Sequence, residues 1–372
     1  MTATNQALTV EDVQAILAEK HSTSHLINRK RHVTLPQWAT AWIVLIPALI
    51  FLVLFMFYPI LNTFFMAFIQ DFRWVSGAGS FAFGNFIQGC FNWKGKFENN
   101  LIPSFGFENF VIVLKNEVFL SSILNTALLV VIEVPLTIIV ALLIATFLNS
   151  IKALKGLYQT IFFLPYVTNT IALGLVFQML FASNTGGLMN ILLKNLFGID
   201  PINWLSSAEV RIGSTALPPA TKFHQGVVIV IYALWNGLAF KILVFMSGLA
   251  TIDKQYSDAA KVDGSSSFTI WRRITLPLLS PQILYITITS FIGAFKMYTG
   301  VMSVYSAAGK GAYYFGGERG EDWITVVGWI YKQLDLSQDK PGIAAAGSLV
   351  LLSIILVITA VQFAVSKRRV HY

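Results

Sequence analysis

The sequence predicts an all-α integral membrane protein with six transmembrane helices. Hydrophobic residues make up 55% of the chain, charged residues make up only 12%, and the mean hydropathy is +0.67. Soluble domains carry about 25% charged residues, so this chain lacks the polar surface that water requires. No Asp, Glu, Lys or Arg occurs in residues 33–70, 156–193 or 341–366. About 18 apolar residues suffice to cross a hydrocarbon core about 30 Å thick.

Each predicted span is helical, because lipid cannot hydrogen-bond to the backbone and every N–H and C=O must be satisfied within the segment. The first span is longer than a perpendicular crossing needs, so we expect Pro59 or an interfacial turn to absorb the excess. The six spans are expected at residues 39–69, 122–148, 157–182, 226–250, 279–303 and 342–365.

Basic residues predict which side each connection faces, since cytoplasmic connections carry an excess of Lys and Arg. One side has 13 Lys+Arg against 6 Asp+Glu, whereas the other has 11 of each. The basic side comprises residues 1–38, 149–156, 251–278 and 366–372. Both termini are therefore expected in the cytoplasm, and the net charge of +8 reflects topology rather than a nucleic-acid partner.

The same pattern divides the chain into four parts. A cytoplasmic tail (1–38) precedes the first helix and its extracytoplasmic loop (39–121). A core of five helices (122–365), which contains the cytoplasmic loop 251–278, is followed by a short cytoplasmic end (366–372).

Residues that carry chemistry are scarce, and we expect no catalytic site, no metal and no cofactor. Cys90 is the single cysteine, and the five histidines all fall outside the predicted spans. Neither a GxxxxGK[ST] phosphate-binding loop nor an HExxH motif occurs. Energy for any transport must come from another chain or from an ion gradient. An ion-coupled transporter or channel, and an intramembrane enzyme, are the alternatives from other classes.

Three charged residues fall inside predicted spans: Glu133, Lys241 and Lys296. A charge at the centre of a membrane costs at least about 2.5–3.5 kcal/mol, so each is a candidate site residue. Glu133 could instead pair with a lysine, and Lys241 could face a partner subunit. Lys296 lies among aromatic and apolar neighbours, which suits a sugar with its polar hydroxyls and apolar ring face.

The cytoplasmic loop 251–278 predicts two short helices joined at Asp263-Gly264, where glycine permits a turn that other residues resist. Ser265 or Ser266 can cap the second helix. Pro277 is expected to stop that helix where the chain re-enters the membrane.

Ala259 and Ala260 leave a small-residue surface on the first of these helices, which another protein can approach closely. This loop resembles the "EAA" motif of ABC importer permeases, which reads EAA, two residues, DG, and a short helix ending in I-x-L-P. The matching residues are Ala259, Ala260, Asp263, Gly264, Ile274, Leu276 and Pro277. The departures are Asp258 for Glu, Ser265 for Ala and Trp271 for Phe.

The resemblance extends over roughly residues 105–365 and is closest to the MalF type of sugar permease. It implies that the loop is a coupling helix that enters a cleft of a cytoplasmic ATPase, with Asp258, Ala259, Ala260, Asp263 and Gly264 making the contact. Weaker matches follow in family order. They are Phe107–Phe110, Phe163–Tyr166, Asn203–Leu205 and Gly342–Ala346.

The resemblance also implies a sugar site. The contacts of the family fall on Tyr166 and Thr170 in the third span, and on Trp235, Asn236 and Gly237 in the fourth. In the fifth span they fall on Gly293, Ala294 and Met297, where the family's aromatic and amide groups are missing, although Lys296 and Tyr298 lie beside them.

A permease of this family implies a defined assembly. It is expected to form a hetero-dimer with a second permease subunit, and this dimer is expected to bind two cytoplasmic ATPase subunits. An extracytoplasmic binding protein delivers the sugar. The expected location is the cytoplasmic (inner) membrane of a bacterium or archaeon, among membrane lipid.

Overall fold

The computed structural model describes residue 14 and residues 36–69, 106–151, 155–183, 187–206, 209–212, 215–305, 323–334 and 340–366. The chain forms two compact units, residues 1–61 and 62–372, and each is treated by itself. Nearly all of the expected tail 1–38, residues 71–105 of the expected extracytoplasmic loop and residues 367–372 of the expected cytoplasmic end lie outside the described residues.

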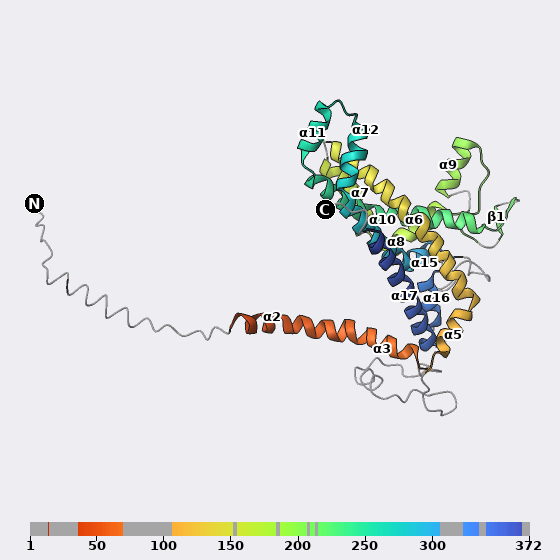
Figure 1. Ribbon diagram of the computed structural model, residues 1–372. Helices are drawn as coiled ribbons and strands as arrows, with labels where there is room; N and C mark the ends of the chain where they lie inside the picture. The colour runs from red at the N-terminus through yellow and green to blue at the C-terminus, as the bar shows by residue number, and fades with distance from the viewer. Residues whose placement is uncertain are drawn as a thin grey trace, which may run out of the picture. The chain divides into compact units, whose positions relative to one another are not determined.

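The first helical segment consists of α2 (Gln37–Leu52), a π-helical turn η1 (Val53–Phe57) and α3 (Tyr58–Ala67) (Figure 1). Its last residues belong to the second unit. In η1 the Tyr58 N–H donates to the Val53 carbonyl, which widens the turn two residues before Pro59. A proline ring crowds the carbonyl four residues earlier, and a widened turn relieves that crowding. The helix therefore continues through Pro59.

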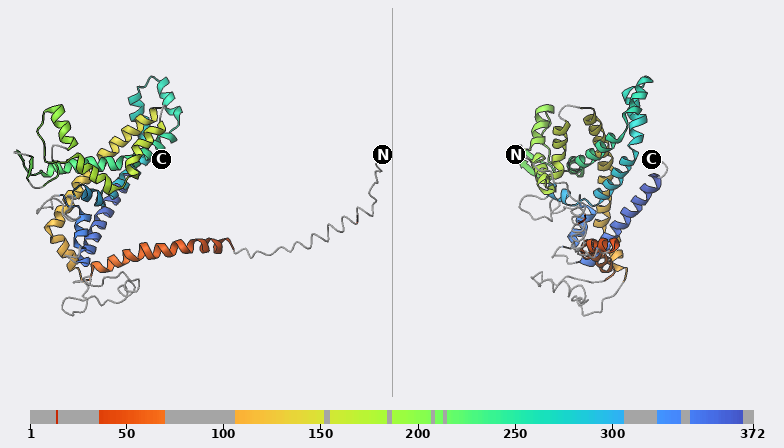
Figure 2. Two further views of the ribbon diagram at one scale, coloured as in Figure 1. Left: turned by 180° about the vertical axis from the view of Figure 1, so that it is seen from behind. Right: turned by 90° about the vertical axis from the view of Figure 1, so that its left-hand side faces the viewer.

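Two long helices, α6 (Glu117–Ser150) and α10 (Lys222–Thr251), pack against each other at the centre of the second unit (Figure 2). Each begins at a side-chain cap: the Asn116 amide oxygen accepts from the Phe119 N–H at 2.9 Å, and Thr221 accepts from the His224 N–H at 3.3 Å. Small residues such as Ala141 on α6 lie in the interface. Because lipid is as apolar as these side chains, close packing rather than exclusion of water holds the helices together.

Shorter elements surround this pair. The helices α7 (Lys155–Val167) and α14 (Ser280–Phe295) pack on it, and α5 (Glu108–Lys115) and α16 (Val326–Gln333) pack on α17 (Pro341–Ser366). The helix α8 (Thr170–Leu180) packs on α15 (Thr299–Tyr305). The connection from α8 to α10 holds α9 (Leu188–Phe197) and an antiparallel hairpin of β1 (Val210–Ile212) and β2 (Thr215–Leu217), in which Val210 pairs with Leu217.

Asn109 and Gly342, from two of the weaker family-like matches, pack together and have a structural role. The Asn109 amide donates to the carbonyls of Ala67 at 3.1 Å and Ile69 at 2.8 Å, which ties α5 to the end of α3. A Cβ at Gly342 would lie 2.9 Å from the Ile69 carbonyl oxygen. Only glycine therefore lets the start of α17 approach this tie.

Within the described residues, four helical segments are long and apolar enough to cross a membrane: Trp38–Ala67, Glu117–Ser150, Lys222–Thr251 and Pro341–Ser366. A fifth candidate is the pair Ser267–Leu278 and Ser280–Phe295, which is bent by 65°. The expectation of six continuous spans is wrong for the third and fifth, which the described chain divides.

The third expected span, 157–182, breaks between α7 and α8 at Thr168 and Asn169. The Asn169 side chain accepts from the Ile171 N–H at 2.8 Å and so caps α8. An asparagine that bonds to its own backbone favours a helix start over a helix interior. Hydropathy could not reveal this break, because both sides of it are apolar.

The fifth expected span, 279–303, breaks after α14, and residues 296–298 link it to α15. The expected stop at Pro277 is also wrong. The helical residues of α12 (Ser267–Ile270), η2 (Trp271–Thr275) and α13 (Leu276–Leu278) continue through Pro277, again after a π turn, and the bend falls at Leu279. Pro281 in the first turn of α14 fits this start.

Candidate functional site

A cavity of about 520 Å³ opens between α6, α7, α8, α10, α14 and α15. Four separate stretches of sequence contribute to its wall: Glu133 of α6, the α7–α8 break, one face of α10, and the end of α14 together with the α14–α15 link. Seven of the eight expected substrate residues line it: Tyr166, Thr170, Asn236, Gly237, Lys296, Met297 and Tyr298. Gly293 and Ala294 line it as well.

Trp235, the eighth expected residue, lies outside this cavity and is 44% exposed. Helical spacing explains the difference. Residues three or four apart share a helix face, so Ala233, Gly237 and Lys241 align and face the cavity. Trp235 falls between these positions and faces elsewhere.

The two helix breaks position the cavity wall. At the first break, the Tyr232 hydroxyl of α10 donates to the Thr170 carbonyl at 3.2 Å. At the second, a Cβ on Gly300 would lie 2.5 Å from the Tyr232 ring, so glycine is needed for α15 to approach α10. Tyr232 therefore contacts both broken spans and holds them beside α10.

Aromatic rings add a wall on the α7 side. The rings of Tyr166 and Phe240 are 6.1 Å apart and nearly parallel, and both line the cavity. Lys296, at the end of α14, is exposed into this space. An aromatic wall with a nearby cation and several hydroxyl and amide groups suits a polar ligand that also has an apolar face.

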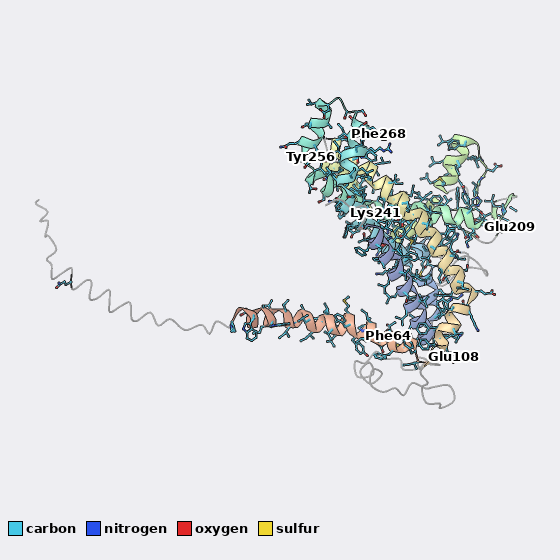
Figure 3. The ribbon with its side chains drawn as sticks, in the orientation of Figure 1. Phe64, Glu108, Glu209, Lys241, Tyr256 and Phe268 are labelled. Atoms are coloured by element: carbon cyan, nitrogen blue, oxygen red, sulfur yellow. The ribbon has the colours of Figure 1, made fainter. Side chains whose placement is uncertain are left out.

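Glu133 of α6 and Lys241 of α10 form a buried ion pair at the cavity, with Oε1 and Nζ 3.7 Å apart. The Thr137 hydroxyl donates to the same Glu133 oxygen at 3.0 Å. Figure 3 labels Lys241 in the middle of the second unit. The sequence indicated both residues as intramembrane charges and a lysine as a possible partner of Glu133, but it did not identify Lys241 as that lysine, because the two residues lie on helices far apart in the chain. Tyr232, Phe240, Thr289 and Ser290 were missed altogether.

The loop after α10 forms the two helices that the sequence predicts. The first is α11 (Lys254–Val262), and Gly264 follows it with φ +78°. The Ser265 N–H donates to the Ala260 carbonyl at 2.9 Å, and the Gly264 N–H donates to the Lys261 carbonyl at 3.0 Å. These two bonds with a left-handed glycine form a Schellman motif, which ends the helix and reverses the chain.

Ser266, one of the two expected caps, begins the second helix by accepting from the Thr269 N–H at 3.3 Å. Ala259 is exposed, and so are the larger apolar side chains of Tyr256, Val262 and Phe268. Figure 3 labels Tyr256 and Phe268 at the same end of the unit. An exposed apolar group of this kind suits a protein contact.

Trp271 connects this loop to the central helices. Its indole Nε1 donates to the Thr146 hydroxyl of α6 at 3.2 Å, a bond that phenylalanine at this position would not make. The loop is thereby fixed to α6 as well as to α10 and α14, which it joins in sequence. Within the described part of the chain, no group of three or more His, Cys, Asp or Glu could hold a metal ion.

The family model described as "Binding-protein-dependent transport system inner membrane component" matches residues 133–371, well over half of the chain. The chain belongs to this family. Membership identifies it as a membrane transport component of an ABC importer, not as a catalytic subunit. The family membership that the loop motif predicts is confirmed. The two alternative classes, an ion-coupled transporter or channel and an intramembrane enzyme, are excluded.

The chain aligns with most of the length of two curated relatives. The arabinooligosaccharides transport system permease protein AraP of Bacillus subtilis is 29% identical over 269 residues, which cover 70% of this chain and 75% of AraP. The lactose transport system permease protein LacF of Rhizobium radiobacter is 27% identical over 329 residues, which cover 88% of this chain and 94% of LacF.

A solved structure shares the fold of this importer permease. It is a bacterial alginate ABC transporter in complex with an alginate pentasaccharide-bound periplasmic protein. The match has a TM-score of 0.66 at 18% identity and covers 89% of this chain and 94% of that one. At this identity the match supports the fold alone.

Proposed function

We propose that this permease carries a sugar or oligosaccharide across the membrane, and that the cavity beside α10 is part of its path. The observation that carries the proposal is the convergence of the expected contact residues from three spans on one cavity. The relatives named for arabinooligosaccharide and lactose transport support the substrate class.

The membrane arrangement has six crossings, of which the third and fifth are discontinuous. In the third, α7 and α8 form the two halves, and in the fifth α14 and α15 do. Irregular backbone at membrane depth is tolerated where it lines a cavity or is buried in protein, which is where both breaks lie. Broken helices are a common way of building a transport site, because they place backbone polar groups at the substrate.

The working assembly comprises a second permease subunit, two cytoplasmic ATPase subunits and an extracytoplasmic binding protein, in the cytoplasmic membrane of a bacterium or archaeon. ATP-driven closure of the ATPases moves α11 and its turn. The bond from Trp271 to Thr146 carries part of that movement to α6. The central helices then alternate between inward-facing and outward-facing arrangements, and the cavity opens to one side at a time.

Replacing Tyr166 by alanine should lower saccharide uptake at least fivefold, because the variant removes an aromatic wall of the cavity.

Lys296→Met should impair uptake of acidic saccharides more than uptake of neutral ones, because it removes a cation from the cavity. Uptake is measured in proteoliposomes that contain the assembled complex, with lactose, an arabinose trisaccharide and an alginate trisaccharide. Assembly is checked by co-purification of the ATPase. If both variants assemble and transport normally, the path lies elsewhere.

The proposed orientation places both chain ends in the cytoplasm. A cysteine at Ser366, in a Cys90→Ser background, should react with a membrane-permeant thiol reagent. The same cysteine should resist a membrane-impermeant thiol reagent added outside intact cells with a permeabilised outer membrane. Rapid labelling by the impermeant reagent from outside would reverse the orientation.

A further inference from the structure

Glu133 and Lys241 are charges that a purely structural helix contact does not need. Their side chains are 6% and 9% exposed and lie on the two central helices. Removing a carboxylate and an ammonium from water costs several kcal/mol per ion, and apolar replacements of both are often neutral or stabilising. Intramembrane charges that face a cavity commonly serve transport, because their cost has no compensation in packing.

The geometry of the pair leaves the ammonium turned toward the cavity. The distance of 3.7 Å between Nζ and Oε1 is longer than a normal charge-assisted hydrogen bond. An ammonium has three donors, and among the described residues Glu133 is the one acidic partner within 4.0 Å of Lys241. Lys241 also lines the cavity wall together with Tyr166 and Asn236.

Gly237 provides the space beside the ammonium. A Cβ there would lie 2.8 Å from Lys241 Nζ and 3.5 Å from Glu133 Oε1. Gly237 lies one turn before Lys241 on α10 and lines the same cavity. Glycine in a helix interior is destabilising relative to alanine. The missing side chain leaves Nζ reachable from the cavity.

We propose that Lys241 is a substrate-contacting residue, whose ammonium donates hydrogen bonds to hydroxyl or carboxylate oxygens of the saccharide. Glu133 is its positioning residue: it orients the ammonium, and the Thr137 hydroxyl fixes the Glu133 carboxylate in turn. This inference rests on the proposed function, and it adds α6 to a substrate site otherwise built from α10 and the broken third and fifth spans.

Two double variants separate this role from a structural ion pair. Glu133→Leu with Lys241→Met removes both charges and keeps apolar volume, so the protein should assemble at least as well as the wild type. Glu133→Lys with Lys241→Glu restores an ion pair in the opposite sense. A structural pair tolerates either change, whereas a substrate contact tolerates neither.

The measurement is the number of saccharide molecules imported per ATP hydrolysed, at saturating binding protein, for the three saccharides of the uptake assay. Lys194→Met, a lysine of α9 outside the cavity lining, serves as the matched control. Both double variants should lower this ratio at least fivefold while ATP hydrolysis and assembly stay near wild type. If the loss is confined to alginate, Lys241 binds a carboxylate, and if it extends to lactose, Lys241 binds hydroxyls.

A normal ratio in the apolar double variant would overturn the role of Lys241 and leave the proposed function standing. If the charge-swapped variant does not assemble, the apolar double variant decides alone. A wild-type complex that imports none of the three saccharides would instead overturn the proposed function, and this inference with it.

Discussion

Gly264→Val is expected to abolish coupling between ATP hydrolysis and transport, although the chain still inserts in the membrane. Gly264 has φ +78°, a backbone conformation that costs roughly 1–2 kcal/mol for residues with a side chain and more for a β-branched one. The Schellman bonds at the end of α11 require this conformation, so valine should displace the turn that presents Ala259 and Ala260.

Uptake by the Gly264→Val complex should fall at least tenfold, with less ATPase co-purified. Gly264→Asn is the matched control, because asparagine adopts the left-handed conformation more readily than other residues with a side chain. It should retain most of the transport. A Gly264→Val complex that holds its ATPase and transports as the wild type does would show that this turn is not the coupling element.

Gly174→Val should prevent α8, the second half of the third span, from packing against α15, the second half of the fifth. A Cβ at Gly174 of α8 would overlap the Ser303 side chain of α15 and would lie 3.0 Å from the Ser303 carbonyl carbon. Backbone cannot yield as a flexible side chain can, so α8 and α15 must separate. Overpacking typically costs about 1–3 kcal/mol of folding free energy and occasionally more. The effect is expected to be large here because the contact between α8 and α15 holds the cavity wall.

The expected result is a much lower yield of folded protein in the membrane and a lower midpoint of thermal unfolding. Gly156→Ala is the matched control, because nothing lies within 4 Å of a Cβ there and the residue is exposed on α7. Wild-type yield and unfolding midpoint in Gly174→Val would contradict the close contact between α8 and α15.

The loop between α10 and α14 could be predicted in detail because its signals are local. A positive φ at Gly264 and a serine cap at Ser266 each depend on a few neighbouring residues. The end of the second loop helix was mispredicted at Pro277, because the widened turn that accommodates the proline has no signature in hydropathy.

The cavity could be predicted only in part. Tyr166 and Asn236 were found through the family resemblance, and both line it. The contact between Glu133 and Lys241 depends on how α6 packs against α10, which no local pattern encodes. The spacing of four residues between Gly237 and Lys241 could have indicated that Lys241 lines the cavity, since it places both residues on one face of α10.

The breaks in the third and fifth spans could not be predicted from apolar composition. A span reads as continuous when both halves are apolar, and the Asn169 cap is visible only beside the helix that it starts. These breaks place Thr170, Lys296 and Tyr298 at the cavity.

An experimental structure of the assembled complex, arrested with a transported saccharide inside it, tests the path most directly. Saccharide density should lie against Tyr166 and Asn236, within hydrogen-bonding distance of Lys241 Nζ. Density confined to another part of the complex, with this cavity closed, would contradict the proposed path.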